Sequence, residues 1–134
     1  MKIDGRCHCG AIAYEAEVDP ETVAICHCTD CQALSGTAFR TIVPVAEGDF
    51  RLVAGEPKIY IKIGDSGAKR AQGFCANCGS AIYATGVGEG PKVYNLRLGT
   101  ARQRGELPPK AHYWYRSAQP WLADLSALPK FEKH

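Results

Sequence analysis

The chain has no long hydrophobic run and no strong excess of charge of either sign. No apolar stretch approaches the ~18 residues of a membrane-spanning helix, and the start, Met1 to Arg6, lacks the apolar stretch of a secretory leader. The formal net charge is only +2, and no repeat or low-complexity segment interrupts the 134 residues. We therefore expect a single cytoplasmic domain over residues 1–134, with no membrane contact and no nucleic-acid partner.

What the sequence does have is cysteine, with seven in all. Cytoplasmic thiols are kept reduced, so clustered cysteines there are more often metal ligands or catalytic groups than disulfides. The odd number also fits a disulfide framework poorly. Seven ligating thiolates and two zinc ions would move the formal charge from +2 to about −1, which weakens the case for nucleic-acid binding further.

The segment Cys26-His27-Cys28-Thr29-Asp30-Cys31 places three thiols within six residues. Residues two apart on an extended backbone point to the same side, so Cys26 and Cys28 should face together while His27 faces outward. We expect Asp30 to help turn the chain and bring Cys31 back toward them. A tetrahedral zinc held by three protein ligands keeps one position free, which is typical of a catalytic site. Three ligands should hold the metal less tightly than four, so we expect partial occupancy.

The other four cysteines occur as Cys7-His8-Cys9-Gly10 and Cys75-Ala76-Asn77-Cys78-Gly79. Together they supply four thiolates, which is enough for one closed, all-cysteine zinc site. The spacing thus predicts a division of four plus three, but it leaves open which pairs meet. Buried free cysteines, and a redox pair at Cys28 and Cys31, are the alternatives.

Short alternating runs predict an all-β fold. In Ile12 to Val18 the apolar positions alternate with Glu15 and Glu17, as in a half-buried strand, and turn signals recur about every ten residues. One helical turn is expected before Gly36. We expect the tail, Pro120 to His134, to pack over the sheet. Arg40 is expected in solvent, with a contact to the thiolates or to a ligand's carboxylate as the alternative. Several aromatic residues are expected in the core rather than in a substrate wall: Phe39, Tyr113, Trp114, Tyr115 and Trp121.

The three cysteine blocks, Gly5 to Gly10, Cys26 to Cys31 and Phe74 to Ser80, resemble in order and spacing the glutathione-dependent formaldehyde-activating family, which includes the centromere protein V relatives. Ala111 to Tyr115 and Pro120-Trp121 resemble that family's second half, so the resemblance covers nearly the whole chain. It implies a zinc-containing β-tent type fold of short antiparallel strands. It also implies a structural zinc and a catalytic zinc, held respectively by Cys7, Cys9, Cys75 and Cys78 and by Cys26, Cys28 and Cys31.

The activity that this resemblance implies is that of a carbon–sulfur lyase. Such an enzyme adds glutathione reversibly to formaldehyde and forms S-hydroxymethylglutathione, so the expected partners are a small thiol and an aldehyde. Two other hypotheses stay open: a non-catalytic zinc module that binds another protein, and a thiol redox protein that uses Cys28 and Cys31. The incomplete three-cysteine set favours the enzyme, and the lack of an obvious general base in the motif keeps the second hypothesis open.

Overall fold

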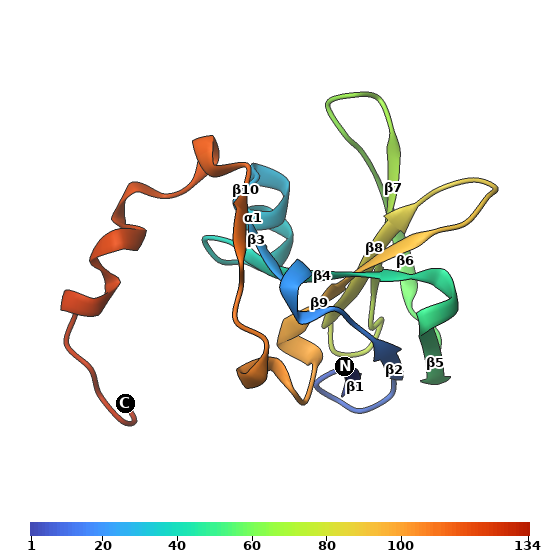
Figure 1. The fold of residues 1–134 in the computed structure, drawn as a ribbon, viewed down its shortest axis with the longest axis horizontal. Coiled ribbons are helices and arrows are strands. Elements are labelled where there is room, and N and C mark those ends of the chain that lie inside the picture. Colours follow the sequence, from blue (N-terminus) through green and yellow to red (C-terminus); the bar gives the residue numbers. More distant parts are fainter.

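The computed structural model describes all 134 residues and arranges ten strands in two sheets (Figure 1). The smaller sheet has the order β1-β2-β5, and its strands span Lys2–Arg6, Ala13–Glu17 and Phe50–Ala54. Both of its pairings are antiparallel. This confirms the all-β expectation for the first part of the chain.

The larger sheet has seven strands in the order β10-β3-β4-β9-β8-β7-β6. Its strands are antiparallel neighbours except at one edge, where β10 runs parallel to β3. In sheet order the strands span Ala111–Tyr113, Ala24–Cys26, Arg40–Ala46, Val93–Arg97, Ala81–Gly86, Lys69–Phe74 and Lys58–Ile63.

Helical structure is limited to one α-helix and six short 3-10 helices. Helix α1 spans Thr29–Ser35; the Cys28 sulfur caps its first turn, and Gly36 ends it in the left-handed conformation with φ 71°. The 3-10 helices η1 to η6 span Pro20–Thr22, Glu47–Asp49, Leu98–Thr100, Arg104–Glu106, Tyr115–Ser117 and Pro120–Ala127. None of these helices is long and apolar enough to cross a membrane.

The core draws on both sheets. In β2, Tyr14 and Ala16 are buried while Glu15 and Glu17 are exposed, as the alternation predicts. Their main partners come from β4, β8 and β9, and include Val43, Val45, Ile82 and Leu96. The Tyr14 hydroxyl and the Thr100 hydroxyl share a hydrogen bond of 3.0 Å. Burial of this side of the larger sheet leaves its other face for polar residues.

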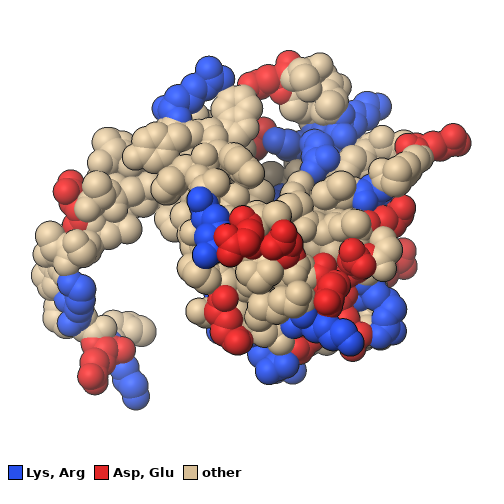
Figure 2. Space-filling model, in the orientation of Figure 1, with Lys and Arg blue, Asp and Glu red and all other residues tan.

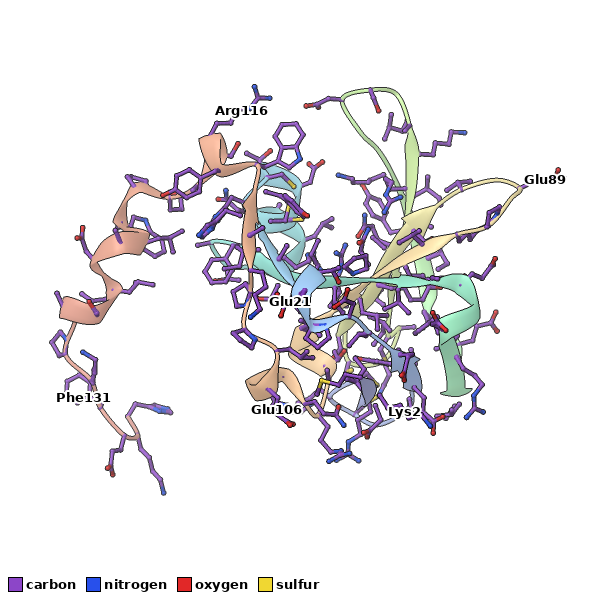
Figure 3. All side chains as sticks on the ribbon, in the orientation of Figure 1. Lys2, Glu21, Glu89, Glu106, Arg116 and Phe131 are labelled. Carbon is purple, nitrogen blue, oxygen red and sulfur yellow. The ribbon has the colours of Figure 1, made fainter.

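The prediction for the tail is wrong. No residue of η6 is buried, and Figure 1 shows the chain after β10 leaving the sheets as an arm that ends far from them. Phe131 is 82% exposed and lies near the end of that arm (Figure 3). The cause is local: β10 is only three residues long, and Trp114 has φ 56°, which turns the chain away from the sheet edge.

The core assignment of the aromatic residues fails for the same reason. Four of the five lie in or after β10 and have exposed fractions of about half or more; they are Tyr113, Trp114, Tyr115 and Trp121. Tyr113 lies in the edge strand β10, and the arm carries the other three past that edge, so their apolar character does not bring them into the core.

Candidate metal centres

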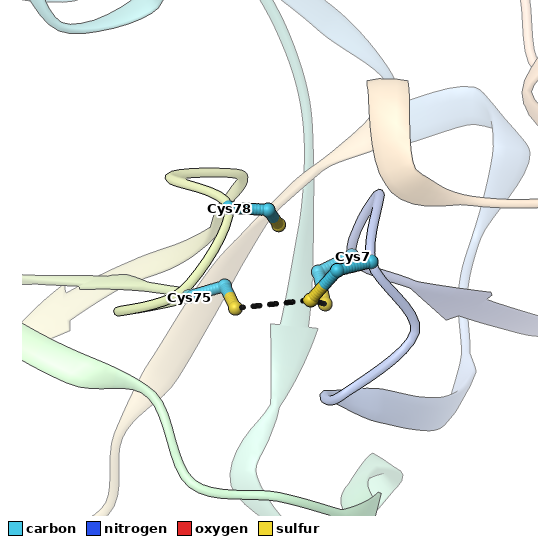
Figure 4. Close-up of side chains that lie close together, drawn as sticks. Cys7, Cys75 and Cys78 are labelled. Carbon is cyan, nitrogen blue, oxygen red and sulfur yellow. Dashed lines mark hydrogen bonds between the residues drawn. The ribbon is translucent and has the colours of Figure 1, made fainter.

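The four sulfurs of Cys7, Cys9, Cys75 and Cys78 lie within 4.8 Å of one another. Figure 4 shows three of these side chains turned toward a common centre from two different loops. The Cys7 and Cys9 sulfurs are 3.6 Å apart, and the Cys9 and Cys75 sulfurs are 3.7 Å apart. A tetrahedron with metal–sulfur distances of about 2.3 Å has sulfur–sulfur edges of about 3.8 Å, so this donor set fits zinc. We call these four residues the closed cluster.

The two loops of the closed cluster are built alike. The Cys7 amide donates to the Ile12 carbonyl at 3.0 Å, and the Cys75 amide donates to the Ser80 carbonyl at 2.9 Å. Each loop also contains a glycine in the left-handed region, Gly10 at φ 84° and Gly79 at φ 80°. That glycine lets the backbone turn back beneath the sulfurs. One loop joins β1 to β2 and the other joins β7 to β8, so the closed cluster links the two sheets.

Hydrogen bonds stabilise thiolates in the closed cluster. The Ile12 amide donates to the Cys7 sulfur at 3.2 Å. The Asn77 side chain, with the backbone of Ala11, lowers the pKa of the Cys9 thiol. The Ser80 hydroxyl and amide lower the pKa of Cys78 to about 5. Thiolates are the form that binds metal, so these contacts prepare the site for it.

The second group is Cys26, Cys28 and Cys31, whose sulfurs also lie within 4.8 Å of one another. Cys26 ends β3, Cys28 caps α1, and Cys31 lies in the first turn of that helix. The Cys31 amide donates to the Cys28 sulfur at 3.2 Å. No further cysteine, histidine or carboxylate ligand atom joins the three sulfurs. We call this group the open cluster.

Two thiols of the open cluster have pKa values shifted in opposite directions. The Cys26 thiol beside it, helped by Cys28, Arg40 and Arg97, lowers the pKa of Cys31 to about 5. The same contact with Cys31, together with burial, raises the pKa of Cys26. A soft thiolate donor set of this kind suits zinc. The sequence predicts these three residues as ligands, and the structure brings them together.

His27 differs from the expectation, because it is turned away from the open cluster but is only 1% exposed. Its Nε2 lies 2.8 Å from Nδ1 of His112, and the ring packs beside Phe39 and Tyr115. Strand β10 covers this side of β3 and excludes water from it. His8, in the other C-x-C block, is exposed as expected.

Two glutamine side chains link helix α1 of the open cluster to neighbouring segments of the chain. The Gln32 side-chain amide donates to the carbonyls of His27 and Ser117 at 2.8 and 3.0 Å. Gln119 in turn donates to the Gln32 side-chain oxygen at 2.7 Å. These contacts hold α1 against the chain that follows β10 and so fix the orientation of the helix carrying Cys31.

A cleft of about 450 Å³ adjoins Cys28. Its lining includes Lys62, Trp114 and Arg116. The Lys62 ammonium donates to the Asp30 carboxylate at 2.6 Å, which ties β6 to α1. A small molecule can therefore reach one sulfur of the open cluster from solvent.

Two arginines lie beside the open cluster: the sequence reasoning missed Arg97 and favoured a solvated Arg40 over a contact with the thiolates. Arg40 is 5% exposed and Arg97 is 8% exposed, so the expectation that Arg40 is solvated is wrong. Register explains its burial, since Arg40 on β4 is the partner of Cys26 on β3. No local sequence signal marks these positions, because they are set by the pairing of strands far apart in the chain.

The fold and the two clusters define a small β protein with two cysteine sites that could hold metal ions, consistent with zinc. Residues 2–117 match the model of the glutathione-dependent formaldehyde-activating enzyme family. The chain therefore belongs to that family. A search of curated proteins finds no match.

Among solved structures, the chain is similar to the crystal structure of a Rhodobacter sphaeroides protein, with a TM-score of 0.62 and 19% sequence identity. The match covers 81% of this chain and 98% of that one. At this identity the likeness concerns the fold. The family match ends at residue 117, just before the exposed arm begins.

Proposed function

We propose that the protein is a zinc-dependent enzyme of the carbon–sulfur lyase type, which joins a thiol such as glutathione to formaldehyde or a related aldehyde. The family match and the open cluster support this proposal. The single observation that carries it is the three-sulfur set beside a solvent cleft, because a closed structural site would have four ligands.

In the proposed reaction the thiol sulfur attacks the carbonyl carbon and a C–S bond forms. The π bond of the carbonyl breaks, and its oxygen takes up the proton that the thiol releases and becomes a hydroxyl group, so no oxidant or reductant is needed. Zinc, when bound, favours the thiolate form of a thiol and polarises a carbonyl oxygen.

The chain's own residues would bind and orient the reactants. Cys26, Cys28 and Cys31 would hold the metal, while Cys7, Cys9, Cys75 and Cys78 would hold the structural zinc. The cleft is lined by charges of both signs, with Lys62 and Arg116 beside Asp30 and Asp65, and Trp114 gives it an apolar wall. The Gln32 contacts fix α1, so the geometry is largely set before a ligand arrives.

The test is magnetisation-exchange NMR on ¹³C-formaldehyde, glutathione and S-hydroxymethylglutathione at equilibrium. Zinc-loaded protein should raise the exchange rate above the uncatalysed rate, and Cys28→Ser should return it to that rate. Removing zinc and adding it back to the wild type serves as the control. Wild-type exchange at the uncatalysed rate, with two zinc ions per chain confirmed, would refute the proposal.

A second candidate is a non-catalytic zinc module that binds another protein. The observation that favours it is the exposed arm, where Trp121 and Phe131 lie unpacked. The same NMR experiment separates the two, because an interaction module would bind two zinc ions and leave the exchange rate unchanged.

A further inference from the structure

Arg40 and Arg97 are buried cations without a carboxylate partner. Neither takes part in any of the salt bridges of the chain. The Nε of each is buried without a hydrogen-bond partner, and the Arg40 side chain makes no hydrogen bond to the protein. Buried charges are normally paired and hydrogen bonded. The nearby anionic groups of the chain are the thiols of the open cluster, since Arg40 and Arg97 both act on Cys31.

Strand register places both arginines on the face of the larger sheet that carries Cys26. Arg40 is the partner of Cys26, and Ile42, two residues further along β4, is the partner of Arg97. Paired residues and residues two apart point to the same side of a sheet. The core residues Val43 and Leu96 are paired on the opposite side. The two guanidinium groups therefore share one face with the open cluster.

Arg97 is held in place from across the sheet. Its terminal nitrogen donates to the Gln72 side-chain oxygen at 2.9 Å. Gln72 is on β7, and strand β8 lies between β7 and the strand of Arg97. On β8 the residue paired with Gln72 is the small Ala84. Burial and repulsion from Arg40 lower the pKa of Arg97 to about 10, so it remains a cation at neutral pH.

Both arginines line a hollow of about 500 Å³. Hydroxyl-bearing residues complete its wall, including Ser35 of α1, Thr37 and Ser80. Figure 2 shows lysine and arginine atoms beside a different depression, between the β6–β7 hairpin and the part of the chain that carries α1 and β10, where the cleft beside Cys28 lies. Guanidinium groups and hydroxyls are the donors that a carboxylate prefers.

The charge of this face is not balanced by the open cluster alone. Zinc with three thiolates would carry a net charge of about −1, and a fourth thiolate from a ligand would make it about −2. On the same face Arg40, Arg97 and Arg70 are all without an ion pair, while Lys62 is already paired with Asp30. Three unpaired cations thus leave room for one further negative charge.

We propose that Arg40 and Arg97 form a carboxylate-binding subsite that selects thiols carrying a carboxylate for the open cluster. This inference rests on the proposed function, since it assumes that a thiol binds at the open cluster. It names a recognition element of the substrate: a thiol whose carboxylate reaches the paired guanidinium groups while its sulfur reaches the metal.

The test is isothermal titration calorimetry of zinc-loaded protein with two thiols that differ in one group. The first is 3-mercaptopropionate, and the second is 2-mercaptoethanol, in which a hydroxyl replaces the carboxylate. The wild type should bind 3-mercaptopropionate about 10- to 100-fold more tightly, as expected for a charge-assisted hydrogen bond. Arg40→Gln should remove most of this preference and leave the Kd of 2-mercaptoethanol unchanged.

Arg51→Gln is the matched control, because Arg51 lies on β5 of the smaller sheet and lines neither the cleft beside Cys28 nor the hollow. It should keep the preference. Arg40→Lys, which keeps the charge but loses the fork of donors, should restore part of the preference. Zinc content and circular dichroism check that each variant is folded; neutral glutamine in place of an unpaired buried cation should not unfold the chain.

The outcomes separate the two proposals. Equal binding of both thiols to the wild type, or a preference that persists undiminished in Arg40→Gln, would overturn the subsite and leave the proposed function standing. Equal weakening of both thiols in Arg40→Gln would mean that Arg40 serves only the cluster, which also overturns the subsite. If neither thiol binds the zinc-loaded wild type, the proposed function fails and the subsite fails with it.

Discussion

The two C-x-x-C pairs offer a matched comparison of the clusters. One variant carries Cys75→Ser and Cys78→Ser, which remove half of the closed cluster. The other carries Cys28→Ser and Cys31→Ser, which remove two ligands of the open cluster. The substitutions are chemically identical and have the same spacing. In the second variant serine at position 28 can still cap α1.

The expected loss of stability differs because the clusters connect different parts of the chain. The closed cluster joins sulfurs 66 residues apart, Cys9 and Cys75, and links the two sheets. Structural zinc contributes about 10–16 kcal/mol in small zinc domains, against a total margin of about 5–15 kcal/mol for a typical domain. The open cluster spans only Cys26 to Cys31, so its metal constrains little of the unfolded chain, and its loss should cost less than about 2 kcal/mol.

Far-UV circular dichroism with denaturant titration, together with metal analysis, checks this expectation. The Cys75/Cys78 variant should be unfolded at 25 °C. The Cys28/Cys31 variant should keep a cooperative transition close to that of the wild type, with one zinc ion per chain instead of two. A folded Cys75/Cys78 variant with wild-type stability would show that the four-sulfur group is not structural, and the reasoning would fail.

Three further outcomes follow from packing. Gly5→Ala should lower the free energy of unfolding by more than about 2 kcal/mol, because an added Cβ would lie within 2.6 Å of Tyr14 and the Thr100 carbonyl; Gly48→Ala, with nothing within 4 Å, is the control and should change it by less than about 0.5 kcal/mol. Tyr14→Phe should cost about 1 kcal/mol in urea unfolding, because the hydrogen bond between the Tyr14 and Thr100 hydroxyls is lost; an unchanged midpoint would mean that water replaces the bond. Deleting the residues after Pro120 should leave zinc content and Tm unchanged, since none of them is buried; a Tm lowered by several degrees would show that the arm packs on the sheets in solution.

The sequence predicts well whatever depends on neighbours in the chain. Alternation places the strands, and the Cys26 to Cys31 spacing predicts three sulfurs facing together, as the structure shows. The left-handed end of α1 at Gly36 is predicted correctly for the same reason. That these sulfurs bind metal is still a prediction, as are the ligand roles of the closed cluster.

What the sequence does not predict depends on distant pairing. Arg40 is buried because β4 lies between β3 and β9, a contact that nothing near residue 40 indicates. His27 is buried because β10 adds to the edge of the sheet some 85 residues later. The prediction for the arm is wrong in the opposite sense, since residues expected to pack are exposed. Its apolar residues resemble a core segment, but the backbone turn at Trp114 leads them away from the sheets.

The turn that contains Gly79 and Ser80 belongs to the closed cluster and also walls the hollow beside Arg40 and Arg97. We therefore expect the protein to assemble in a fixed order. Metal binding at the four cysteines fixes this turn first, and the turn then forms one wall of the hollow where a substrate anion would bind. The supply of metal for the closed cluster would then limit how many molecules can bind substrate, even though that ion does not contact the reactants.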